Sequence, residues 1–166
     1  MKALLALCLF ALLNAALAAE EPPSTAPFFA LTLNAADGKP LRLDTLKGKP
    51  LVLNFWARWC GPCRKEIPDL ALMHARYQAK GLVIVGIAVE DAASIDSVRE
   101  FAKAYEMNYT LLMGGVQKSM ELMQSLGNPQ SGLPFTLLID RQGRVVARKL
   151  GAMSLADMDA AIKLIL

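Results

Sequence analysis

The sequence predicts an α/β domain, a three-layer sandwich in which helices cover both faces of a mixed β-sheet. Two observations lead to this prediction. Short runs rich in Val, Ile and Leu alternate along the chain with segments of helical periodicity, and a hairpin and a helix close the chain. The length of 166 residues suits one domain with a short appendage.

Each element follows from the local pattern of apolar and turn-forming residues. Strands are expected where apolar and β-branched residues run together between turn residues, at 28–33, 41–43, 51–56, 82–89, 110–113, 135–139 and 145–150. Helices are expected where apolar residues recur at helical spacing, at 60–80, 94–105, 116–126 and 154–166. Asp37-Gly38 makes a hairpin of the first two strands. Leu51–Trp56 is mostly apolar, so it is expected to be a central strand buried on both faces.

The N-terminus has the layout of a secretory signal peptide. Lys2 gives a positive start, an apolar run follows, and residues 16–18 (Ala-Leu-Ala) form a cleavage pattern. We assign 1–19 to the signal peptide, 20–27 to a flexible leader and 28–166 to the domain. The alternative is an uncleaved anchor in the membrane, although the run is short for a span. In both cases the domain is expected in the periplasm or another extracytoplasmic compartment.

Composition and charge argue against several other classes. A net charge of +3 gives no reason to expect nucleic-acid binding, and three cysteines are too few for a disulfide-rich mini-protein. Cys8 lies in the apolar run and would be lost on export, which leaves Cys60 and Cys63. A disulfide across so small a loop restricts the unfolded chain very little. The pair is therefore expected to be a redox centre.

The pentapeptide Trp59-Cys60-Gly61-Pro62-Cys63 carries this chemistry. A disulfide exchanger needs one exposed thiolate and a second thiol that resolves the mixed disulfide. Cys60 is expected at a helix N-terminus, where free N–H groups and the helix dipole lower the pKa of its thiol below about 8.5. Cys63 lies one turn further in and is expected to be more buried. Pro62 suits the first helical turn, and Trp59 offers an apolar platform for a partner chain.

The competing interpretation of the cysteines is half of a zinc site. Such a site needs a second pair of Cys or His ligands, and the only histidine is His74. His74 follows Cys63 by 11 residues, which is about 16 Å along a helix. We therefore expect no metal and no other cofactor, and a His74 on the surface or on a helix face. Three basic residues either add positive charge near the cysteines or are solvated, namely Arg58, Arg64 and Lys65.

The segment from Asn54 to Pro68, NFWARWCGPCRKEIP, resembles the active-site segment of the thioredoxin superfamily, and specifically of its exported TlpA/ResA-like branch. The resemblance covers the chain from about Pro27 to the C-terminus. It implies a thioredoxin-like fold with an N-terminal β-hairpin and a central insertion. Gly61 and Pro62 between the cysteines form the thioredoxin-like pairing, which goes with low, reducing potentials.

The resemblance also implies roles for particular residues. Pro134 matches the family's cis-proline, which faces the cysteines, and the backbone of Leu133 would pair with an extended substrate segment. The plain alternative is a trans proline that enters a strand. Glu66 matches an acidic residue near the buried cysteine, where it would handle the Cys63 proton and raise the cysteine pKa values. The alternative is a solvated helix glutamate. Pro68 matches the family's helix-kinking proline.

One position departs from thioredoxins proper, which carry a buried Asp where this chain has Asn54. Asn cannot ionise, so it cannot accept the proton of Cys63. Glu66 would take over that role. The departure argues against a general cytosolic thioredoxin.

We therefore expect an exported thiol-disulfide oxidoreductase. Cys60 attacks a disulfide of an exported partner protein, and Cys63 resolves the mixed disulfide. The family implies a reductant role, in which a membrane electron donor of the thiol-disulfide type re-reduces the pair. Its partners in the family include apocytochrome c and copper-site assembly proteins. We expect no nucleic-acid partner, and we expect a monomer.

Three other functions remain open at this stage. An exported disulfide oxidant or isomerase has the same motif, although the sequence offers no dimerisation domain. A Cu(I) carrier would use the same thiolates, but its relatives have a wider cysteine spacing and a distant His. A thiol peroxidase would need a lone cysteine with Pro and Thr or Ser just upstream, where this chain has Phe-Trp-Ala-Arg-Trp.

Overall fold

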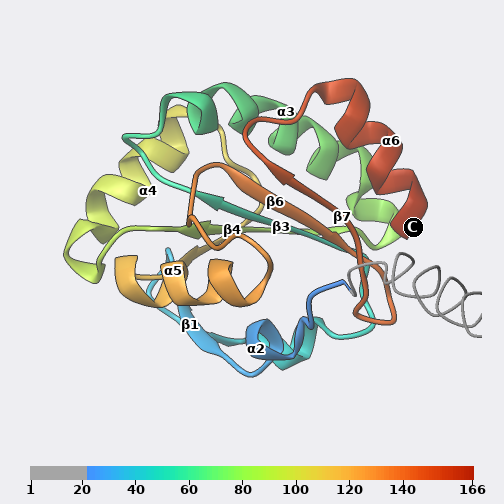
Figure 1. The fold of residues 1–166 in the computed structure, drawn as a ribbon. Coiled ribbons are helices and arrows are strands. Elements are labelled where there is room, and N and C mark those ends of the chain that lie inside the picture. Colours follow the sequence, from blue (N-terminus) through green and yellow to red (C-terminus); the bar gives the residue numbers. More distant parts are fainter. Residues whose placement is uncertain (1–21) are drawn as a thin grey trace, which may run out of the picture.

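A seven-stranded sheet forms the centre of the structure, a computed structural model that describes residues 22–166 (Figure 1). Its strands are β1 (Thr32–Ala35), β2 (Pro40–Arg42), β3 (Leu51–Trp56), β4 (Val83–Ala88), β5 (Thr110–Met113), β6 (Phe135–Ile139) and β7 (Val145–Leu150). The helices are α2 (Ala26–Phe29), α3 (Gly61–Tyr77), α4 (Ile95–Ala104), α5 (Val116–Ser125) and α6 (Leu155–Ile165). Short 3-10 turns are η2 (Leu43–Leu46), η3 (Gln78–Lys80) and η4 (Ala92–Ser94). The predictions for the signal peptide, for Cys8 and for the start of the leader lie outside the described residues.

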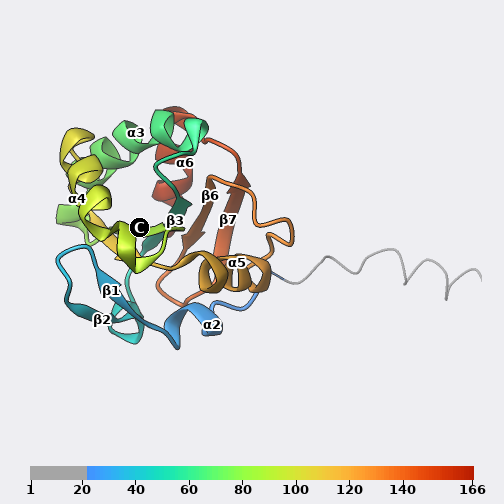
Figure 2. The ribbon, with the colours of Figure 1, turned by 90° about the vertical axis from the view of Figure 1, so that its left-hand side faces the viewer.

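The sheet is mixed, and helices cover both of its faces. The strand order is β2-β1-β5-β4-β3-β6-β7. The central pairs β3–β4 and β4–β5 are parallel, whereas the hairpins at both edges and the β1–β5 and β3–β6 pairs are antiparallel. Helices α3, α4 and α6 lie on one face, and α2 and α5 lie on the other (Figures 1 and 2). The predicted three-layer α/β/α sandwich is confirmed.

Strand β3 shows how the sequence builds the two halves of the core. All six of its residues are buried, as the apolar run predicts. Alternate side chains point to opposite faces of a sheet, so Leu53 and Phe55 join the core under α2 and α5, while Val52 and Trp56 join the core under α3, α4 and α6. Asn54 therefore belongs to the α3 face, where the cysteines lie.

Most predicted elements are confirmed to within one or two residues. Helix α3 runs into η3 and ends at Gly81, whose φ of 88° is a left-handed conformation that glycine adopts readily. Ser154 caps the N-terminus of helix α6, since its hydroxyl accepts the backbone N–H of Asp157, an arrangement typical of a serine at this position.

The start of the domain corrects the sequence analysis. The prediction of a strand at 28–33 is wrong, because residues 26–29 form helix α2 and the strand begins at Thr32. Phe28 and Phe29 are buried against η2 and α5, so tertiary packing overrides the strand preference of an aromatic run. The hydroxyl of Thr25 donates to the carbonyl of Gly143 at 2.6 Å. The folded domain thus includes residues 25–27, which the sequence placed in the leader.

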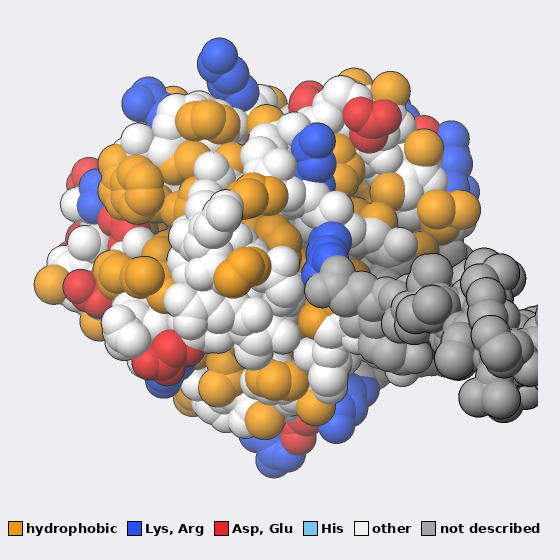
Figure 3. Space-filling model, in the orientation of Figure 1, with side chains coloured by type: hydrophobic (Ala, Val, Ile, Leu, Met, Phe, Trp, Pro, Cys, Tyr) orange, Lys and Arg blue, Asp and Glu red, His pale blue; other side chains and the backbone are white. Residues whose placement is uncertain are grey.

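The surface gives no sign of segregated charge on the face drawn in Figure 3, where Lys and Arg side chains are scattered rather than gathered. Within residues 22–166, no helix has the length and hydrophobicity that crossing a membrane would require.

Candidate active site

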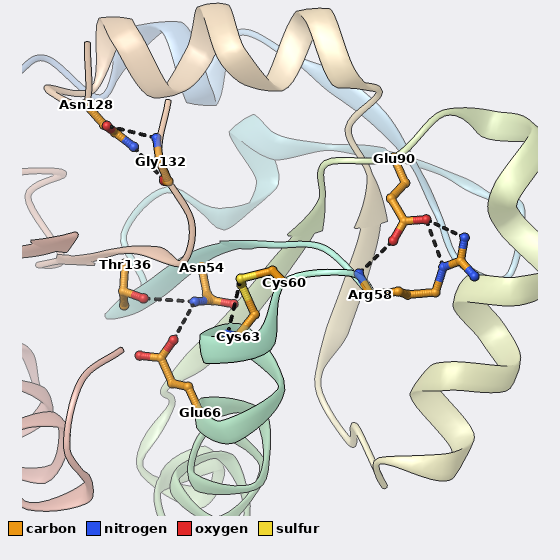
Figure 4. The surroundings of a disulfide bond; sticks show 9 residues. All are labelled: Asn54, Arg58, Cys60, Cys63, Glu66, Glu90, Asn128, Gly132 and Thr136. Carbon is orange, nitrogen blue, oxygen red and sulfur yellow. Dashed lines mark hydrogen bonds and ion pairs between the residues drawn. A yellow bond between two sulfur atoms is a disulfide. The ribbon is translucent and has the colours of Figure 1, made fainter. Parts of the chain in front are cut away.

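The two cysteines form a disulfide at the N-terminus of α3 (Figure 4). Their Cα atoms are 5.3 Å apart, a separation that fits a disulfide. Cys60 is the N-cap residue of α3, and its Sγ accepts the backbone N–H of Cys63 at 3.2 Å. Pro62 lies in the first turn of the helix, where its missing N–H costs nothing. The backbone therefore offers a free N–H to Cys60 Sγ, as predicted for a stabilised thiolate.

Exposure at the turn differs from the prediction in one respect. The sequence analysis expects an exposed Cys60, but in this disulfide form Cys60 is 4% exposed and Cys63 is 1% exposed. Both side chains belong to the core cluster on the α3 face, because the bond to Cys63 holds Sγ of Cys60 against the helix. The surface here is made by Gly61, Pro62 and Trp59, which is 72% exposed.

The loop before β6 carries the proline that the resemblance singles out. The Leu133–Pro134 peptide bond is cis, so the alternative of a trans proline is wrong. Leu133 packs against the core cluster that contains both cysteines. The side chain of Asn128 braces the loop, since its amide donates to the Gly132 carbonyl at 2.9 Å and its Oδ1 accepts the Gly132 N–H at 3.3 Å (Figure 4). The contact of Leu133 with substrate stays a prediction.

Glu66 is buried, which rules out a solvated helix glutamate. It is 2% exposed and lies one turn after Cys63 on α3, below the disulfide in Figure 4. Its Oε1 accepts the backbone N–H of Met153 at 3.1 Å, and its Oε2 accepts the side-chain amide of Asn54 at 3.3 Å. Both donors are neutral, so no cation offsets the charge of this carboxylate through these bonds.

Burial is the main influence on the ionisation of Glu66. Loss of hydration raises the pKa of Glu66 from its ordinary 4.5 to about 7, although the hydrogen bonds from Met153 and Asn54 act in the opposite direction. Asn54 itself is held by the sheet. It lies opposite Thr136 of β6 in register, and its amide donates to Oγ1 of Thr136 at 2.9 Å. A carboxyl group with a pKa near neutral pH thus lies buried on α3, one turn after Cys63.

A second buried carboxylate lies on the other side of the turn. Glu90 follows β4 and accepts three donors of Arg58, which precedes Cys60 by two residues (Figure 4). Of the other two basic residues near the motif, Arg64 contacts Tyr105, since its guanidinium donates to the hydroxyl at 2.7 Å and lies over the ring.

His74 contacts Tyr109 rather than the cysteines or the two buried glutamates. It is half-buried on α3, and its ring lies edge-on to Tyr109 with centroids 6.4 Å apart. Within residues 22–166, no group of three or more His, Cys, Asp and Glu side chains is placed to hold a metal ion.

Four residues that shape the site escaped the sequence analysis: Asn128, Thr136, Met153 and Glu90. Thr136, Met153 and Glu90 act through contacts with residues at least 32 positions away, and Asn128 acts through the backbone of a loop, so no spacing pattern marks them.

A disulfide that caps a helix after a central strand, with a cis-proline loop in the same domain, defines a thiol-disulfide oxidoreductase of the thioredoxin fold. The chain belongs to the Redoxin family, whose model matches residues 21–162. Within the thioredoxin superfamily it is a TlpA/ResA-like protein.

Individual relatives agree with this assignment. The chain is 32% identical over 148 residues to the thiol-disulfide oxidoreductase ResA of Bacillus subtilis, and this match covers 87% of this chain and 78% of the relative. Among solved structures, a thiol:disulfide interchange protein from Chlorobium tepidum superposes with a TM-score of 0.74 at 30% identity, covering 89% of this chain and 97% of that one. A secreted thiol-disulfide isomerase from Corynebacterium glutamicum has a TM-score of 0.71 at 28% identity, with 81% and 83% covered.

Proposed function

We propose that this protein is exported and reduces disulfides in other exported proteins, as in cytochrome c maturation or metal-site assembly. The observation that carries the proposal is the Cys60–Cys63 pair at the N-terminus of α3, with the exposed Trp59 beside it. Export is supported by the layout of residues 1–19 and by a relative described as secreted. In this proposal a membrane electron donor of the thiol-disulfide type re-reduces the pair, and the protein acts as a monomer, either free or held by an N-terminal anchor.

The proposed cycle balances in two exchange steps. The thiolate of Cys60 attacks one sulfur of the partner disulfide, which forms a mixed disulfide and releases the other partner sulfur as a thiolate. Cys63, after losing its proton, attacks Sγ of Cys60 and releases the second partner sulfur. The partner gains two electrons, and the protein ends in the disulfide form that the structure shows. The donor then returns two electrons to the pair.

Glu66 is the proposed acceptor for the Cys63 proton. It lies one turn from Cys63 and is buried, and its raised pKa of about 7 suits a group that takes up and releases a proton near neutral pH. Its negative charge would also raise the pKa values of the cysteine thiols.

Five residues form the proposed contact surface for the partner chain, namely Trp59, Gly61, Pro62, Leu133 and Pro134. Trp59 supplies an exposed apolar ring. Gly61 and Pro62 are exposed and small, so their side chains do not obstruct the approach of a partner chain to the cysteines. The backbone of Leu133, before Pro134, would pair with an extended partner segment.

The direction of electron flow is tested by the reduction potential of Cys60–Cys63, measured by equilibrating the domain with glutathione buffers. We expect a value near that of thioredoxin, roughly −270 mV. Partners can then be trapped as mixed disulfides with Cys63→Ala. A value near the oxidising end, roughly −120 mV, would reverse the direction and favour an oxidant.

The role of Glu66 is tested by titrating the thiolate absorbance of Glu66→Gln. We expect lower cysteine pKa values, because a neutral amide removes the repulsion between the carboxylate and a thiolate. Glu121→Gln is the matched control, because Glu121 is an exposed glutamate of α5, on the opposite face of the sheet. Identical titrations of Glu66→Gln and the unmodified protein would refute the role.

A further inference from the structure

The buried carboxylate of Glu90 holds the turn that leads into the active site. Its Oε1 accepts the backbone N–H of Arg58 at 2.8 Å, and its Oε2 accepts Nε at 2.8 Å and Nη2 at 2.7 Å (Figure 4). Glu90 is 6% exposed, and the side chain of Arg58 is 33% exposed. Charge-assisted bonds of this kind are among the stronger hydrogen bonds in proteins, so both the backbone and the guanidinium of Arg58 are fixed.

Arg58, one member of this ion pair, precedes Cys60 by two residues. The N–H of Cys60 donates to the carbonyl of Ala57 at 3.1 Å, which closes a tight turn over Arg58. The chain at Glu90 is anchored too, since the preceding Val89 N–H donates to the Trp56 carbonyl at 2.8 Å. The cycle proposed above uses neither Arg58 nor Glu90, although Arg58 precedes the attacking Cys60 by only two residues.

A similar arrangement elsewhere separates mechanical support from electrostatic influence. In the turn between β6 and β7, the buried Asp140 accepts Nε and Nη2 of Arg144, each at 2.7 Å, and the backbone N–H of Arg144 at 2.9 Å. That pair braces a turn with no cysteine in it. The Arg58–Glu90 pair differs in its neighbour, which is a thiol whose ionisation sets its reactivity.

We propose that Arg58 and Glu90 are positioning residues that tune the reactivity of Cys60. Glu90 fixes the guanidinium of Arg58 on the turn that leads to Cys60 and offsets its positive charge, so this turn carries a neutral pair rather than a free cation. This inference rests on the dithiol cycle proposed above.

The pair acts among other charges that the substitutions leave in place. The other charged residues at the start of α3, in the segment after β4 and on α4 are Arg64, Lys65, Glu66, Asp91, Asp96, Arg99, Glu100 and Lys103. The 127–134 loop before β6 and the 151–154 segment before α6 contain no charged residue. We expect a single uncompensated charge on this turn to shift the pKa of the Cys60 thiol by about half a unit to one unit. That corresponds to about a three- to tenfold change in the ratio of thiolate to thiol.

The test compares single and double variants in which the two charges are removed. Glu90→Gln should lower the pKa of Cys60, because Arg58 then acts as an uncompensated cation. Arg58→Gln should raise it, because Glu90 is then unpaired. The double variant should return to within about twofold of the unmodified protein, and Arg58→Lys, which keeps the charge, should stay close to it. Asp140→Asn is the matched control and should leave the thiol titration unchanged.

Two readouts are taken on each variant, the thiolate absorbance titration and the equilibrium with glutathione. Stabilising the thiolate stabilises the reduced protein, so Glu90→Gln should make the pair about three- to tenfold easier to reduce and Arg58→Gln harder by a similar factor. Shifts of the same sign in both single variants, or no shift beyond that of Asp140→Asn, would overturn the inference, since a purely structural brace predicts these results. The absolute potential of the unmodified protein tests the direction of the cycle separately.

Discussion

Glu66→Gln should stabilise the disulfide form of the protein in a pH-dependent way. Glu66 is almost fully buried and is held by neutral donors, so burying its charge opposes folding. The substitution replaces the carboxylate by an amide of nearly the same size. The experiment uses the oxidised protein, in which the cysteines do not titrate.

The sign of the effect follows from the raised pKa. The folded state binds the Glu66 proton more tightly than the unfolded state, so between pH 4.5 and 7 the folded form holds more protons. The stability of the unmodified protein therefore falls as the pH rises through this window. The shift of 7 − 4.5 = 2.5 units corresponds to a penalty on the order of 3 kcal/mol above pH 7, absent below pH 4.5.

The surroundings can accept a glutamine at this position. Its Oε1 can still accept the Met153 N–H, and its amide can donate to Oδ1 of Asn54, which is buried and has no hydrogen-bond partner among the described residues. This pairing requires Asn54 to reverse its amide, and Oδ1 would then exchange places with the nitrogen that contacts Thr136. The hydroxyl of Thr136 can donate or accept, so the reversed amide keeps a partner.

Guanidinium denaturation of both proteins at pH 5 and pH 8 measures the effect. We expect the variant to be more stable by on the order of 3 kcal/mol at pH 8, with most of the difference gone at pH 5. Other titrating groups are shared and cancel in the difference. Glu121→Gln, an exposed substitution, should show neither effect. A difference of the same size at both pH values would refute the reasoning, because it would show that Glu66 does not change its protonation on folding.

Three further predictions concern packing and contact. Trp59→Ala should leave the free energy of unfolding within about 0.5 kcal/mol, because the ring is exposed, but should raise the KM for a protein disulfide several-fold. Gly114→Ala should destabilise by about 1–3 kcal/mol, because its Cβ would overlap Ser119 Oγ and Ile87 Cγ2, whereas Gly61→Ala meets no atom within 4 Å and should be neutral in thermal denaturation. Ser154→Ala removes the N-cap acceptor of α6 and should cost about 1 kcal/mol.

The strands of the core could be predicted because their pattern is local. Leu51–Trp56 and Phe135–Ile139 are mostly apolar runs, each with a single polar residue, and both are fully buried strands in the structure. The start of α3 was equally visible, since Cys60, Gly61 and Pro62 combine a cap with a proline suited to the first turn. Here the local preference of the chain and its tertiary environment agree.

The wrong strand at 28–33 shows where a local pattern misleads. Two adjacent phenylalanines favour a strand, yet Pro27 lies in the first turn of α2, a position that proline favours. That signal was present in the sequence. The burial of both rings against η2 and α5 was not, since it depends on residues up to about a hundred positions away.

The two buried carboxylates show the same limit at the site. Spacing places Glu66 on the face of α3 that carries Cys63, but its burial depends on Asn54 and Met153, which are 12 and 87 residues away. Arg58 and Glu90 are separated by 32 residues, and no spacing rule connects them. The sequence could therefore suggest a role for Glu66 only through the resemblance, and it gave no indication of Glu90.

The hydrogen-bond partners of Glu90 and Glu66 indicate different roles for these two carboxylates. Glu90 is neutralised by a guanidinium in the same cluster of hydrogen bonds, so its contribution is to fix a turn and a charge. Glu66 accepts only neutral donors in a buried site, and its pKa of about 7 lets it exchange a proton close to physiological pH. A dithiol cycle depends on the protonation of both thiols, since Cys60 must be ionised for attack and Cys63 must lose its proton only when the mixed disulfide has formed. In the proposed cycle the carboxylate paired with a cation is the one bound to Arg58, and the carboxylate one turn from Cys63 is the proposed proton acceptor.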